Sequence, residues 1–313
     1  ISYYRQPGTN TYWGAAHAPS THYMWFGQCD RGMALDTPRG LRHPRANPIA
    51  CDVNSEIYGH FYKYLAERIQ CALPDKRLVL MAYSSYLKAP RTVGRFPDNV
   101  QILACIGQPM FAWNDDYMRD VCETYGGWNR LCAPDKRAIP YLYAPGAGTD
   151  PIFSFLHGYC MGDFLRKTET VRDPHHYYPC FGTYPVNSPL GGYLQFRAAW
   201  NPASDADAAR RDFLMRMFGA DAGQHLLALT DRILTVWRER YIPRISKGKY
   251  VGKNLRSIQQ TEFDCYYGEV LNEPTVVAME RELESAGSAL GDDPLRKRRF
   301  DIVGGRFRKT FEM

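Results

Sequence analysis

The first two thirds of the chain alternate apolar runs with amphipathic segments, and this alternation constrains the fold more than any other feature. Residues 77–83 (RLVLMAY) and 100–106 are almost wholly apolar, as strands are when both faces of their sheet are covered. Residues 54–69 instead place apolar side chains three to four positions apart, which is typical of a helix packed along one face. Strands that alternate with helices in this way predict a parallel sheet.

We predict five strands, and then a change to a wholly helical pattern from about Leu190 onward. An eight-stranded (β/α) barrel takes ~250 residues, more than the segment before that change. The predicted fold is therefore α/β, a (β/α) TIM-type barrel represented by its later strand-helix units in residues 1–188. Residues 189–313 are predicted to form an α-helical domain packed on the barrel. The expected strands are 23–26, 77–83, 100–106, 138–143 and 178–184.

Composition argues against several classes of protein. Long apolar runs that would span a membrane do not occur, and the net charge of +6 is mild. We interpret the basic terminal segments as a solvated helix face, so no nucleic-acid partner is predicted. The nine cysteines include no C-x-x-C pair, and His175-His176 lacks companion ligands, so neither a metal nor another cofactor is expected. The start at Ile1, without an initiator Met or a signal-peptide pattern, fits a processed product or a fragment.

A polar segment, Gly27 to Asp36 (GQCDRGMALD), opens directly after the first predicted strand. Loops in this position carry the chemistry of α/β barrels. The segment resembles the run C-x-C-D-R-C-x-A-L-D of the family called domain of unknown function 4838. Gly27 and Gly32 stand where relatives commonly have cysteines, and the preceding turn, residues 19–23, has no acid where relatives have one.

The resemblance continues in order along the chain, from about Pro19 to Leu229. It includes the turn LPDK at 73–76, the strand end MAY at 81–83, and the segment GYLQFRAAWNP at 192–202. It implies a barrel related to hexosaminidase-type glycoside hydrolases, among them endo-β-N-acetylglucosaminidases. It also implies an oligosaccharide or glycan as partner, and a secreted or periplasmic location.

The aromatic content agrees with such a ligand. The chain has 22 Tyr and 6 Trp, whose flat apolar faces and polar edges suit stacking on sugar rings or on bases. For any single aromatic residue, packing in the core is the commoner role. The excess as a whole favours a ligand with apolar faces and many hydroxyl groups.

Three residues are candidates for acid–base catalysis: Asp30, Asp115 and His22. Glycosidic cleavage usually needs two carboxyl groups, although in substrate-assisted enzymes the acetamide of the sugar replaces one. Asp30 follows a predicted strand end, where a catalytic acid is expected. A structural role, as the partner of Arg31 in an ion pair or as a loop cap, explains its presence equally well. Asp115 follows another strand end, with a helix N-cap as the alternative. His22 has an ordinary pKa near neutrality, which suits a proton donor.

The substrate-binding candidates follow successive strands and are predicted to converge on one rim. They supply hydroxyl and amide groups for the sugar, and one indole for stacking. Each alone is equally compatible with packing. They are Tyr83, Gln108, Trp113, Tyr143, Tyr184 and Asn187.

Two functions follow from these observations. The first is a glycosidase-like protein that acts on or binds N-acetylhexosamine-containing glycans by acid–base hydrolysis, with or without participation of the substrate. The second is a non-catalytic carbohydrate-binding barrel that has lost an active-site acid. Thr21-His22, in place of the acidic turn, motivates the second.

Overall fold

Five short strands lie in one parallel sheet in the order β1-β2-β3-β4-β5, so each strand pairs with its neighbour in sequence. In β2 and β3, Leu78 lies opposite Val100 and Ala82 opposite Ala104. The prediction of a parallel α/β fold is confirmed. The described strands form no closed barrel, and β1 and β5 are the edge strands. The strands are β1 (Tyr23–Phe26), β2 (Arg77–Ala82), β3 (Val100–Ala104), β4 (Ile139–Tyr143) and β5 (Tyr178–Cys180).

The computed structural model describes most of the chain between the first strand and the last helix. The gaps include most of the N-terminal fifty residues and the segment before the last two helices. The described residues are 23–26, 52–83, 86–105, 108–143, 150–175, 178–180, 188–245 and 270–311.

Helices follow the strands as the apolar spacing predicts. In α1 (Asp52–Ala72), Tyr62 is fully buried and its hydroxyl donates to the carbonyl of Met81 at 2.8 Å, which fixes the helix against β2. The short 3-10 helix η4 (Pro109–Phe111) precedes α2 (Asp115–Asn129), and α3 (Pro151–Lys167) follows β4. Helix α3 begins where predicted because the side chain of Asp150 accepts from two free backbone N–H groups of its first turn.

Helix α2 extends beyond Gly126-Gly127, where the sequence pattern suggests its end. Trp128 is fully buried and its indole N–H donates to the carbonyl of Leu87 at 2.7 Å. The side chain of Asn129 accepts from the N–H of Ala138 at 2.8 Å. These tertiary contacts stabilise the last turn and outweigh the tendency of the glycine pair to end a helix.

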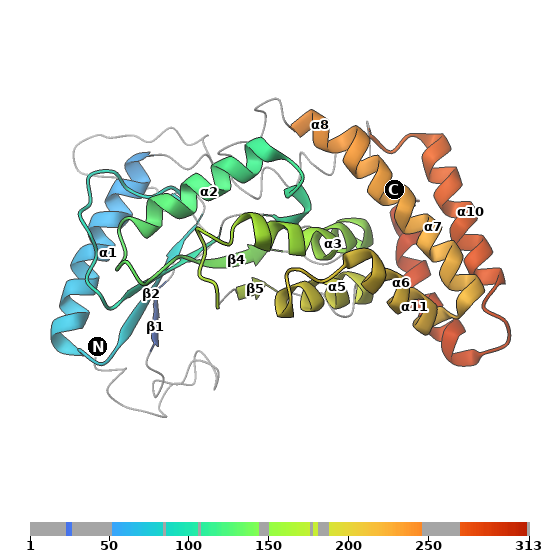
Figure 1. Ribbon diagram of the computed structural model, residues 1–313, viewed down its shortest axis with the longest axis horizontal. Coiled ribbons are helices and arrows are strands. Elements are labelled where there is room, and N and C mark those ends of the chain that lie inside the picture. The colour runs from blue at the N-terminus through green and yellow to red at the C-terminus, as the bar shows by residue number, and fades with distance from the viewer. Residues whose placement is uncertain are drawn as a thin grey trace.

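The rest of the described chain is helical, as predicted from Leu190 onward. In Figure 1 the sheet lies at one end of an elongated molecule and α7, α10 and α11 at the other, with α3 and α5 between them. Helix α7 continues without a break through the π-helix η6 into α8. The helices are α5 (Pro189–Trp200), α6 (Ala206–Phe218), α7 (Ala220–Val236), η6 (Trp237–Tyr241), α8 (Ile242–Ile245), α10 (Glu273–Ser288) and α11 (Pro294–Phe311).

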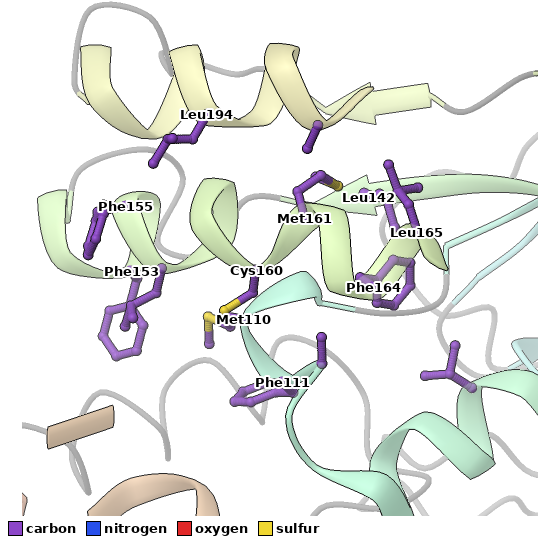
Figure 2. Close-up of a cluster of buried hydrophobic side chains, with 14 of the residues drawn as sticks. Met110, Phe111, Leu142, Phe153, Phe155, Cys160, Met161, Phe164, Leu165 and Leu194 are labelled. Atoms are coloured by element: carbon purple, nitrogen blue, oxygen red, sulfur yellow. The ribbon is translucent and has the colours of Figure 1, made fainter. Parts of the chain in front are cut away.

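Helix α3 is the centre of the hydrophobic core (Figure 2). Phe153, Cys160 and Phe164 lie on α3 among buried side chains of η4, β4 and α5. The helices α3 and α5 approach so closely that a Cβ added to Gly158 would lie 2.1 Å from the carbonyl oxygen of Gly191. The core therefore continues from the sheet into the helical part of the chain. Within the described residues, no helix is long and apolar enough to cross a membrane.

Candidate functional site

The carboxyl ends of the five strands lie at one edge of the sheet, because all neighbouring strands are parallel. Two predicted binding residues with described side chains follow these ends. Tyr83, directly after β2, is half-buried and packs against the core. Gln108 follows β3 and is fully buried.

Gln108 is the more informative of the two. Its backbone N–H donates to the hydroxyl of Tyr117 at 2.6 Å, which holds the turn between β3 and η4. Neither atom of its side-chain amide has a hydrogen-bond partner within the described part of the chain. A buried amide left without a partner costs ~1–3 kcal/mol. The Gln108 side chain is therefore a candidate for contact with a ligand or a bound water.

Asp115 has the environment of an ionised surface carboxylate. Its side chain is 87% exposed, and the Lys167 ammonium group donates to Oδ1 at 3.0 Å. This hydrogen bond and the charge of Lys167 hold the pKa of the carboxyl below its ordinary value. The N-cap of α2 is the neighbouring Asn114, whose side chain accepts from the N–H of Tyr117. A general acid needs a raised pKa, so this environment favours a structural role for Asp115 in the first turn of α2.

Several predicted residues fall elsewhere. His22, Asp30, Tyr184 and Asn187 lie outside the described residues, and so does the side chain of Tyr143, whose backbone ends β4. The structure therefore brings Tyr83 and Gln108 to one edge of the sheet through the strands that precede them.

Trp113 lies in a groove between helices. Its indole N–H donates to Oδ2 of Asp163 at 2.7 Å, and the Arg238 guanidinium carbon lies 4.3 Å from its ring centroid. Tyr159 meets the indole edge-on, with ring centroids 6.0 Å apart. Asp163 and Tyr159 belong to α3, and Arg238 belongs to η6.

The groove consists of two adjoining cavities of about 360 and 440 Å³, which share Tyr159, Asp207 and Arg238. We call it the α3–η6 groove. Its first cavity is lined by helix and loop residues, including Trp113, Asp163, Arg166 and Asp205, and its second by residues of α3, α6, α7 and η6.

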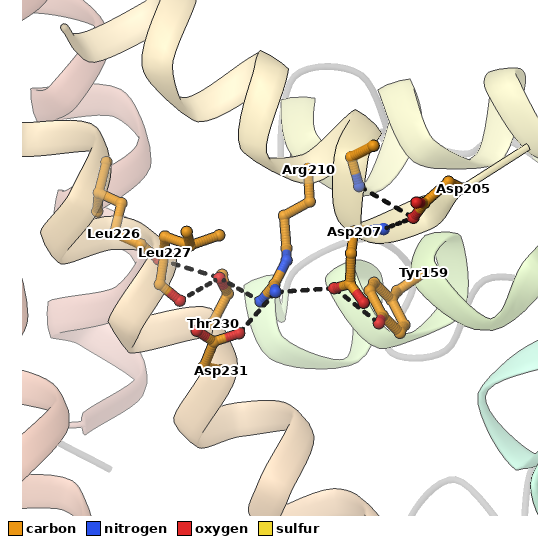
Figure 3. A network of polar contacts seen from close by, with 9 residues as sticks. Tyr159, Asp205, Asp207, Arg210, Leu226, Leu227, Thr230 and Asp231 are labelled. Atoms are coloured by element: carbon orange, nitrogen blue, oxygen red, sulfur yellow. Dashed lines mark hydrogen bonds and ion pairs between the residues drawn. The ribbon is translucent and has the colours of Figure 1, made fainter. Parts of the chain in front are cut away.

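Buried Arg210 organises one wall of the groove (Figure 3). Its guanidinium donates to Asp207 at 2.8 Å and to Asp231 at 2.6 Å, and also to the hydroxyl of Thr230 at 2.9 Å. Asp207 in turn accepts from the Tyr159 hydroxyl at 2.9 Å. The network thus ties α6 to α7 and to α3.

Sequence reasoning missed this groove. In the sequence, Asp205 and Asp207 have the spacing of a helix start, and Asp205 is the N-cap of α6. Trp113, Tyr159 and Arg238 come from distant parts of the chain, so no local spacing indicates that they meet.

Comparisons with family models, with curated proteins and with solved structures found no match to this chain. The resemblance to domain of unknown function 4838 accordingly rests on the ordered short motifs alone.

Proposed function

We propose that this chain is a glycoside-hydrolase-like protein that binds and hydrolyses N-acetylhexosamine-containing glycans at the carboxyl edge of its sheet. The observation that carries the proposal is the parallel order of the five strands, each of which ends at or is followed by a candidate site residue. In α/β folds of this kind, ligands bind beyond the carboxyl ends of the strands.

The spacing of the candidates along the chain supports one shared site. Asp30 stands four residues after the end of β1, and Gln108 stands four residues after the end of β3. Four residues span at most ~14 Å, so both Asp30 and Gln108 stay within that distance of the strand ends that precede them. Tyr83 follows β2 directly, and Tyr143 is the last residue of β4.

Each of these groups has a role in the proposed reaction. Asp30, as the acid, transfers its proton to the glycosidic oxygen as the bond to the anomeric carbon breaks. The acetamide oxygen of the sugar attacks that carbon, and water later adds to the same carbon and opens the ring so formed, giving its proton back to the Asp30 carboxylate. Gln108 and the tyrosines hydrogen-bond the acetamide and the hydroxyl groups and so orient the sugar.

We also infer that residues 1–188 are the later part of a (β/α) barrel, and that residues 189–313 form a helical domain packed on it. The five consecutive parallel strands, with helices α1, α2 and α3 in the connections that follow β1, β3 and β4, support the barrel. The hydrogen bond from Trp237 to Met110, and the close packing of α5 on α3, support the docking of the helical part.

The second candidate is carbohydrate binding without catalysis. One observation favours it: Asp115, the other predicted acid, is exposed and paired with Lys167, which leaves Asp30 as the single carboxyl candidate. His22 would then take the place of a lost acid.

Hydrolysis and binding assays on the full chain separate the two candidates. We expect the protein to cleave aryl N-acetylglucosaminides or chitooligosaccharides, and Asp30→Asn to abolish turnover while binding persists. Asp115→Asn serves as the matched control and should leave turnover unchanged. Binding without turnover selects the non-catalytic alternative, and the absence of both rejects the proposed function.

A further inference from the structure

We draw no further inference here: the strongest candidate, the outer face of α11 with the exposed side chains of Leu295, Arg298 and Ile302, carries nothing because the glutamates of the adjoining helix α10 offset its positive charge and nothing in the described part of the chain shows what covers it.

Discussion

The indole N–H of Trp237 donates a hydrogen bond of 2.8 Å to the carbonyl oxygen of Met110, across 127 residues of sequence. Trp237 is fully buried in the π-helix η6, and Met110 lies in the turn that follows β3. This bond couples the helical part of the chain to the end of the sheet where the glycan site is proposed.

Replacing Trp237 by Phe should destabilise the fold by ~1–3 kcal/mol. The variant keeps an aromatic ring but leaves the buried Met110 carbonyl without its donor. Chemical denaturation monitored by circular dichroism measures the change. Trp200→Phe is the control, because Trp200 is 93% exposed and its replacement should alter stability by less than ~0.5 kcal/mol.

Two glycine-to-alanine substitutions should have opposite effects on the stability of the fold. In Gly158→Ala, the new methyl group would meet the Gly191 carbonyl at 2.1 Å, so α3 and α5 must separate at a cost of ~1–3 kcal/mol. In Gly126→Ala, no atom lies within 4 Å of the new methyl group, and the better helix propensity should stabilise α2 by up to ~1 kcal/mol. Equal melting temperatures for the two variants would contradict the close approach of α3 to α5.

Loss of the Arg210 guanidinium should loosen the contact of α6 with α7. Arg210→Leu removes the bonds to Asp207, Asp231 and Thr230, and we expect a destabilisation of ~1–3 kcal/mol. The two carboxylates are more than half exposed, so leaving them unpaired adds little. Arg211→Leu, at the exposed neighbouring position, should be nearly neutral in the same unfolding assay.

His157 should make stability depend on pH. Burial lowers its pKa from 6.5 to about 3. Between these values the unfolded chain binds a proton that the folded chain does not, so the contribution is complete above pH 6.5 and is lost as the pH falls. The loss is at most ~1.4 kcal/mol per pH unit. His157→Gln should reduce the difference in unfolding free energy between pH 7 and pH 5, as measured by chemical denaturation at the two pH values, and an unchanged difference would contradict the assignment.

The periodicity of apolar residues was enough to predict the strands and nearly all the described helices, because burial of one face or of both dictates that spacing. The prediction failed where contacts between distant segments of the chain set the end of a helix. The end of α2 depends on Trp128 and Asn129 bonding to other segments. At its start, Asn114 and Asp115 are equally good caps, and the chain before the helix makes Asn114 the cap.

The candidate site was predictable only in part, for a similar reason. Once a strand is predicted, the residues that follow its carboxyl end are known as well, so Tyr83 and Gln108 could be predicted as site residues from the sequence. Trp113, predicted to contact a ligand, lines the α3–η6 groove, whereas its neighbours Tyr159 and Arg238 were not predicted as site residues. Their proximity depends on the docking of η6 against α3 and η4, which no local pattern encodes.

The location of the glycan site is the central claim, and hydrogen–deuterium exchange with a chitooligosaccharide tests it most directly. We predict that the sugar protects peptides after the carboxyl ends of the strands, at residues 27–30, 83–86 and 105–108, and that Gln108→Ala weakens this protection. Peptides before the amino ends, at 74–77 and 97–100, should exchange as in the free protein. Protection of the amino ends, or of neither edge, would contradict the account.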